Sequence, residues 1–184
     1  KATFIRVGYV NHAGLAYSHI PKKEKKILSV FDVTPTRPIF YTSQGYAIAP
    51  YNEEMILGFL KDIIKVCDDE TWQILWKTKR IVGSSFISNA FQQKRLDLIE
   101  NHMISIKPTI AAVSLVEASD AVITVPFSSP SLIAKVKGIP SAYYDSSGLV
   151  KKTESHGLPM LKSKAELKEW FESLPVNHSV DIYD

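Results

Sequence analysis

The chain has 184 residues, a formal net charge of +3 and 45% apolar residues, which suits one domain and excludes wholesale disorder. No apolar run approaches the roughly 18 residues of a membrane-spanning helix. The single Cys67 excludes an intrachain disulfide, and the mild positive charge lacks the interleaved aromatic and basic residues that are typical of nucleic-acid binders.

The N-terminal part of the chain gives weak signals before the first regular elements. Residues 1–26 are expected to form an added strand and a loop. An apolar strand follows over 27–31, and the prolines of the 32–38 turn stop regular structure there. Apolar residues at helical spacing then predict a helix ending near Cys67, with Asn52 as its N-cap.

Strands and helices alternate over the rest of the chain. We expect strands at 72–76, 103–106, 121–125 and 142–145, and helices at 88–101, 110–118, after Ser129 and, behind a capping box, after Ser163. The tail, 176–184, has no pattern of its own. Residues 27–175 are therefore predicted to form one domain.

The predicted strands are short and almost continuously apolar, which is typical of a parallel sheet covered on both faces. The fold class is therefore α/β: a doubly wound, mainly parallel, Rossmann-like sheet of about five to six strands. Such sheets bind ligands beyond the C-terminal ends of their strands. Polar turns should meet at that edge, at 32–37, 77–80, 106–109 and 126–131, with 145–148 beside them.

The 126–131 turn is the best candidate for an anion site. It lacks the glycine patterns of nicotinamide enzymes and of P-loops, but Ser128 and Ser129 precede a helix whose first N–H groups are unpaired. Hydroxyls and N–H groups at a helix N-terminus suit a phosphate. Alternatively, one of the serines simply caps the helix, and the two roles are compatible.

Two further turns carry hydroxyls and positive charge. Thr34, Thr36 and Arg37 follow one strand, where Arg suits a bidentate phosphate contact, although a surface ion pair is the alternative. Asp32 is most simply a turn-former. At the next strand end, only part of the 77–80 basic segment can face a ligand, because side chains alternate along a strand.

The remaining polar candidates are less specific. Asp145 could accept hydrogen bonds from ribose hydroxyls, or form an ordinary turn with the Ser146-Ser147-Gly148 that follows. The five histidines show neither metal-ligand spacing nor a recognisable catalytic triad.

Taken in order, these segments resemble a known family. The resemblance rests on Val30–Pro35, Lys77–Arg80, Ser119–Pro130 and Gly138–Gly148, and above all on the Pro-Phe-Ser-Ser, Gly-x-Pro and Tyr-Tyr-Asp pieces in their order. The chain resembles, over roughly 27–172, the C-terminal half of bacterial surface-polysaccharide glycosyltransferases of the GT-B type. It departs from the family at Asp145–Gly148, where a Pro-Thr-Gly sequence usually follows the aspartate.

The resemblance implies a nucleotide-sugar site and assigns residues to it. The donor phosphate would be bound by Ser128, Ser129, Thr34, Thr36, Arg37 and Lys79 or Arg80. The nucleoside would lie against Ile106, Pro108 and Asp145. Family members commonly need no bound metal or other cofactor, so none is expected.

The resemblance also implies a partner lobe. GT-B enzymes hold the acceptor and usually the catalytic base in an N-terminal lobe, for which this chain is too short, so the catalytic residues stay unassigned. We expect a cytoplasmic enzyme, with possible peripheral association at the inner face of the bacterial membrane, acting on a glycan or lipid-linked acceptor and not on nucleic acid. A lobe of a sugar-nucleotide epimerase and a non-catalytic nucleotide-binding module are the alternatives.

Overall fold

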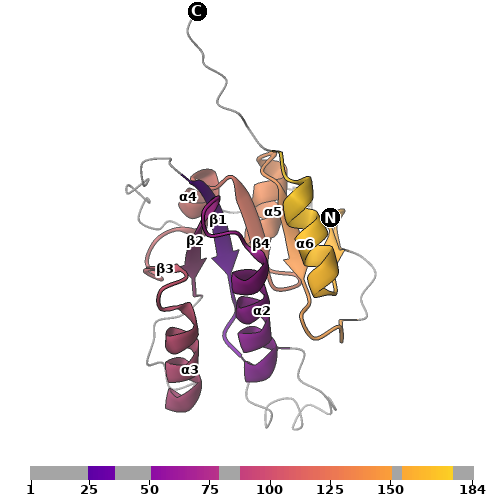
Figure 1. Cartoon of the computed structure of the whole chain (residues 1–184). Helices are drawn as coiled ribbons and strands as arrows, with labels where there is room; N and C mark the ends of the chain where they lie inside the picture. The colour runs from indigo at the N-terminus through magenta and orange to yellow at the C-terminus, as the bar shows by residue number, and fades with distance from the viewer. Residues whose placement is uncertain (1–24, 36–50, 79–87, 151–154, 176–184) are drawn as a thin grey trace, which may run out of the picture.

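A parallel sheet organises the part of the chain that the computed structural model describes, which is residues 25–35, 51–78, 88–150 and 155–175. Its strands are β1 (Lys26–Phe31), β2 (Trp72–Lys77), β3 (Ile104–Ile106), β4 (Ala121–Thr124), β5 (Ser141–Tyr144) and β6 (Met160–Leu161). Every pairing is parallel, and the strand order is β3-β2-β1-β4-β5-β6 (Figure 1). The predicted doubly wound, Rossmann-like α/β fold is confirmed.

The edge strand β6 is the one strand of the described sheet that the sequence did not predict. It has only two residues, too few for a periodic apolar pattern. Backbone hydrogen bonds create it, because the N–H groups of Tyr143 and Asp145 donate to the carbonyls of Pro159 (2.9 Å) and Leu161 (2.8 Å). A pairing of this kind depends on the neighbouring strand and leaves little trace in the local sequence.

The described helices are α2 (Glu53–Val66), α3 (Asn89–Ile99), α4 (Ala112–Glu117), α5 (Ser129–Val136) and α6 (Lys164–Ser173). Four of the five described helices begin within a residue of the predicted start, and α4 begins at Ala112, two residues later than predicted. Three of the five have a side-chain N-cap: Asn52, Ser88 and Ser163 accept hydrogen bonds from backbone N–H groups of the first turn at 2.7, 3.2 and 3.2 Å. These caps satisfy donors that a helix start otherwise leaves unpaired.

The helices cover both faces of the sheet, as the continuous apolar strands predicted (Figure 1). Leu28 and Val30 of β1 share one core with α2, α3 and α6. Ile27 and Phe31, which alternate with them, share the other core with α4 and α5. Successive side chains of a strand point to opposite faces, so a strand that is covered on both faces is mostly apolar.

The strand order creates a switch point between β1 and β4. The chain runs outward from β1 through β2 to β3, and then returns to the other side of β1 to form β4, β5 and β6. The helix that follows β1 and the helix that follows β4 therefore cover opposite faces, and a crevice forms between the two strand ends.

Two predicted segments lie outside the described residues. They are the N-terminal strand and loop, of which only Lys25 and Lys26 are described, and the tail at 176–184. None of the helices in the described ranges has the length and apolar character needed to cross a membrane.

Candidate functional site

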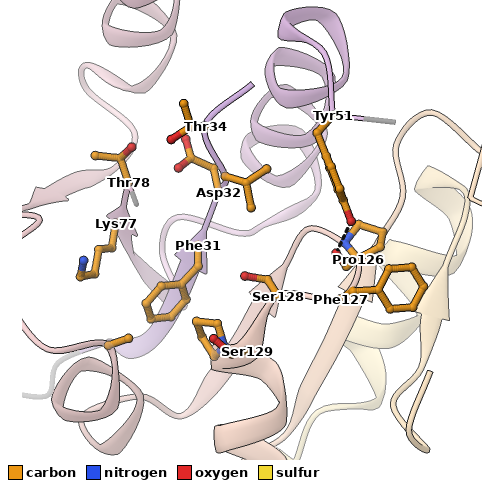
Figure 2. A pocket seen from close by; sticks show the side chains of 13 residues that line it. Phe31, Asp32, Thr34, Tyr51, Lys77, Thr78, Pro126, Phe127, Ser128 and Ser129 are labelled. Atoms are coloured by element: carbon orange, nitrogen blue, oxygen red, sulfur yellow. Dashed lines mark hydrogen bonds between the residues drawn. The ribbon is translucent and has the colours of Figure 1, made fainter. Parts of the chain in front are cut away.

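A cavity of about 510 Å³ lies at the switch point, beyond the C-terminal ends of β1, β2 and β4 (Figure 2). It is lined by the turns that follow these three strands, together with the starts of α4 and α5 and one tyrosine before α2: Phe31, Asp32, Val33, Thr34, Tyr51, Lys77, Thr78, Ala112, Pro126, Phe127, Ser128, Ser129 and Pro130. This is the position at which open α/β sheets bind ligands.

The cavity brings together three of the predicted phosphate-binding residues, Thr34, Ser128 and Ser129. Four others, Thr36, Arg37, Lys79 and Arg80, lie outside the described residues. The three predicted nucleoside contacts, Ile106, Pro108 and Asp145, are described, but they do not line this cavity.

The β4–α5 turn presents its serines without using them as caps. Ser128 occupies the N-cap position of α5, yet its side chain makes no capping hydrogen bond, and Ser129 is exposed at the first helical position. The first N–H groups of a helix have no partner within it. Two hydroxyls and the positive end of α5 therefore meet at the cavity wall.

The same turn is strained and held from two sides. Phe127 has a φ of 59°, which is uncommon and costly for a residue with a side chain. Its ring packs against Tyr143, with the ring centroids 5.8 Å apart. The Tyr51 hydroxyl donates to the carbonyl of Pro126 at 2.7 Å (Figure 2). These contacts fix the path of the backbone immediately before the two serines.

Lys77 is the one cation that lines the cavity among the described residues. Its Nζ donates to the carbonyl of Pro108 at 3.1 Å. Burial lowers the pKa of Lys77 because it disfavours the ammonium form, while the charge of Asp32 acts in the opposite direction. The sequence analysis selected Lys79 and Arg80 from the basic segment, whereas the cation that the described structure brings to the cavity is Lys77, with Thr78 beside it.

Asp32 has a larger role than the turn-forming one suggested by the sequence. Its Oδ2 accepts hydrogen bonds from Arg95 NH1 at 3.1 Å and from Trp76 Nε1 at 3.2 Å, and both members of this ion pair are fully buried. Burial raises the pKa of Asp32 to about 6, even though the charge of Arg95 and the hydrogen bonds lower it.

The sequence analysis did not single out Arg95, although its spacing from apolar residues of the same helix indicates that it is buried. It lies four residues after Phe91 and four before Ile99, and both of these are buried. Because residues four apart share a helix face, the spacing places Arg95 on the apolar side of α3. A charged residue there needs a buried partner, and the carboxylate of Asp32 supplies it.

The predicted nucleoside residues have other contacts. Ile106 packs in the core beneath α4, and the Pro108 carbonyl accepts the bond from Lys77. The Asp145 carboxylate accepts hydrogen bonds from Ser147 N and Oγ (3.1 and 2.6 Å) and from Val150 N (2.8 Å), which is the turn that the sequence offered as the alternative. Their contact with a nucleoside stays a prediction.

The fold and the cavity define a class: a Rossmann-like domain with a polar ligand site at its topological switch point. The model of one protein family matches residues 13–171. The chain belongs to this family, the polysaccharide biosynthesis PFTS motif proteins. The sequence nearest to the letters of that motif is Pro126-Phe127-Ser128-Ser129, the turn that lines the cavity, with serine in place of threonine.

A solved structure shares this fold. A putative UDP-N-acetylglucosamine 2-epimerase from Listeria monocytogenes matches 83% of this chain with a TM-score of 0.53 and 14% identity. The C-terminal domain of a glycosyl transferase group 1 family protein from Francisella tularensis matches 80% of this chain and 73% of that domain, with a TM-score of 0.43 and 13% identity. The chain spans 36% of the length of the epimerase structure. No curated protein sequence matches the chain.

The family and the fold agree with the resemblance drawn from the sequence, a GT-B-type, Rossmann-like domain of polysaccharide biosynthesis.

Proposed function

We propose that this chain is the nucleotide-sugar donor-binding lobe of a glycosyltransferase that builds a bacterial surface polysaccharide. The observation that carries the proposal is the meeting of Ser128, Ser129 and Lys77 around one cavity at the switch point. Family membership supports the sugar chemistry, and a helix N-terminus with hydroxyls and a cation supports a phosphate ligand.

The donor phosphate would lie at the N-terminus of α5. Both serine hydroxyls can donate to its oxygens, and the Lys77 ammonium and the helix dipole would stabilise its charge. When the sugar is transferred, the nucleotide leaves with additional negative charge, and the same groups would stabilise that charge as it develops. This arrangement needs no metal ion. Following the resemblance, Thr34, Thr36, Arg37 and Lys79 or Arg80 would complete the phosphate site.

The acceptor and the catalytic base would belong to a second lobe, as in the GT-B enzymes that the chain resembles. An epimerase lobe remains the alternative, because a domain that holds a nucleotide sugar serves either reaction. Release of nucleotide that depends on an added glycan or lipid-linked acceptor would support transfer. Conversion of the bound sugar to its epimer without acceptor would support the epimerase.

The double variant Ser128→Ala/Ser129→Ala tests the phosphate site. Each hydroxyl that donates to a charged phosphate contributes about 1.5–3 kcal/mol, so we expect the loss of both to raise the dissociation constant about a hundredfold or more. Calorimetric titration with UDP, GDP, ADP and CMP measures it, using whichever of these binds to the unmodified chain.

The matched control is Ser163→Ala, which removes a serine from the start of α6 on another part of the fold. Its nucleotide affinity should equal that of the unmodified chain. The proposal fails if none of the four nucleotides binds, or if the double variant binds as tightly as the control.

A further inference from the structure

A tyrosine from a distant part of the chain holds the turn that carries the two serines. Tyr51 lies 75 positions before Pro126, and its hydroxyl donates to the carbonyl of that proline at 2.7 Å. Figure 2 shows the Tyr51 side chain reaching from the start of α2 to the β4–α5 turn. A bond between these two places belongs to neither helix, so its effect falls on the turn that it holds.

The start of α2 is a fixed base for this tyrosine. Asn52, the next residue, caps the helix, because its side chain accepts a hydrogen bond from Met55 N at 2.7 Å. Met55 is buried in the core that also contains Val125, the residue before Pro126. Both ends of the bond from Tyr51 are therefore attached to the same close-packed core, which resists their movement relative to each other.

The bond acts on the strained residue of the turn. The Pro126 carbonyl belongs to the peptide group that precedes Phe127, and rotation of Phe127 relative to that group is its φ angle, which is 59°. A positive φ is costly for a residue with a side chain, so the turn tends to rotate away from it. Tyr51 holds the peptide group and the ring contact with Tyr143 holds the side chain, so both sides of this rotation are restrained.

The proline makes the turn dependent on the bond from Tyr51. Pro126 has no backbone N–H group, so its carbonyl is the one backbone group through which a hydrogen bond can orient it. Within the turn, Ser128 N donates to the carbonyl of Val125 at 3.3 Å, which is long for a bond of this kind. The 2.7 Å bond from Tyr51 is therefore the stronger restraint on the path of the backbone.

The placement of the two serines follows from this restraint. Ser128 comes directly after Phe127 at the N-cap position of α5, yet its side chain makes no capping bond. Ser128 and Ser129 line the cavity instead. A change of φ at Phe127 would rotate the backbone that follows, and it would move both hydroxyls relative to Lys77, the cation that lines the same cavity.

We propose that Tyr51 is a positioning residue of the phosphate site: its hydroxyl keeps the β4–α5 turn in the conformation in which Ser128 and Ser129 meet a phosphate. The assignment rests on the proposed function, because it names a determinant of the same site. Tyr51 acts on the ligand through the backbone of the turn. Without its hydroxyl, a fraction of the molecules leaves the binding conformation, and the apparent affinity falls by that fraction.

Calorimetric titration of Tyr51→Phe with UDP, GDP, ADP and CMP tests the proposal, using whichever of these binds to the unmodified chain. The substitution keeps the ring and removes the hydroxyl, and we expect the dissociation constant to rise about fivefold to tenfold. The matched control is Tyr144→Phe, which removes a hydroxyl that also donates at 2.7 Å, but to Asp62. Its nucleotide affinity should equal that of the unmodified chain, although both variants should unfold at lower urea concentrations.

Amide chemical shifts of the nucleotide-free proteins test whether Tyr51 acts through the turn. In Tyr51→Phe, the amide signals of Phe127, Ser128 and Ser129 should move, because the backbone there has lost its restraint. The amide signal of Ser163, at the start of α6, should stay in place. In Tyr144→Phe, the three turn signals should move by clearly less.

The assignment to Tyr51 is overturned if Tyr51→Phe binds nucleotide as tightly as the unmodified chain while Ser128→Ala/Ser129→Ala binds it more weakly, and the proposed function then stands. Equal loss of affinity in both tyrosine variants overturns it too, because it indicates general damage to the fold. A lower affinity with unmoved turn signals would mean that the hydroxyl contacts the ligand directly, which contradicts a positioning role. Absence of binding to the unmodified chain overturns the proposed function together with this assignment.

Discussion

Asp32 combines full burial with an ion pair, and the two effects on its charge oppose each other. Desolvation is the larger one and raises the pKa from 3.8 to about 6, while the charge of Arg95 and the hydrogen bonds lower it. The carboxyl group therefore binds its proton more tightly in the folded chain than in the unfolded chain, where the pKa is about 3.9. This difference links the stability of the domain to pH.

The free energy of unfolding should show this linkage when the unmodified chain is compared with Asp32→Asn. The folded state holds the Asp32 proton between about pH 4 and pH 6, so the contribution of Asp32 to stability falls as the pH rises through that range. A shift of about two pKa units corresponds to about 3 kcal/mol. Urea denaturation at pH 4, 5, 6 and 7 measures both proteins.

The informative quantity is the difference between the two unfolding free energies, because the other carboxyl groups titrate alike in both proteins. We expect the unmodified chain to lose stability relative to the variant by about 2 kcal/mol between pH 4 and pH 7, because the carboxyl group of the unfolded chain is already partly ionised at pH 4. A difference that is constant, or that grows in favour of the unmodified chain as the pH rises, contradicts the raised pKa.

Single residues were predictable where the signal was local. Ser128 and Ser129 sit between an apolar strand and a helix, and this pattern alone placed them at the sheet edge. The partnership of Asp32 and Arg95 spans 63 positions, and no local pattern reports such a pair. The sequence marks Lys77 only as part of the basic segment at 77–80, because its hydrogen bond to the carbonyl of Pro108 depends on the path of the chain after β3.

At the scale of the element, the serines at helix starts differ in what they do. Ser88 and Ser163 accept hydrogen bonds from the first turns of α3 and α6, whereas Ser128 makes no such bond to α5. The sequence predicted the starts of α2, α3, α5 and α6 to within a residue, because polar N-cap residues precede these helices, whereas α4 begins two residues later than predicted, after Ala111. It could not tell a serine used as a cap from a serine left available to a ligand.

This difference predicts that alanine substitutions of the two kinds of serine lower the free energy of unfolding by different amounts. Ser163→Ala should lower the free energy of unfolding by about 1 kcal/mol, because it removes an existing cap. Ser128→Ala should lower it by clearly less, since no capping bond is lost. Denaturation by urea without nucleotide compares the two variants. Equal losses, or a larger loss for Ser128→Ala, would mean that this serine is mainly a structural cap.

At the scale of the whole molecule, the architecture followed from the continuity of the apolar strands and their alternation with helices. Both properties predict a parallel sheet with two covered faces. The six described strands form a parallel sheet of this kind, with one hydrophobic core on each face. The strand order was beyond reach from the sequence, because it depends on which strands pair across long crossovers. That order creates the switch point, and with it the cavity.

A second hollow allows the location of the site to be tested. It has a volume of about 400 Å³ and lies at the other end of the strands, near the starts of β1, β2 and β3. Its lining includes Lys25, Asp69 and Asn101. Open parallel sheets bind ligands beyond the C-terminal ends of their strands, so this hollow should not respond to nucleotide.

The most direct test is to map nucleotide binding to the unmodified chain by amide chemical shifts in NMR. On titration with UDP, GDP or CMP, we expect the largest changes at Thr34, Lys77, Thr78, Ser128 and Ser129, with Lys25, Asp69 and Asn101 unchanged. Changes that centre on the hollow at the other end of the strands, or no changes with any of the three nucleotides, would contradict the proposed site.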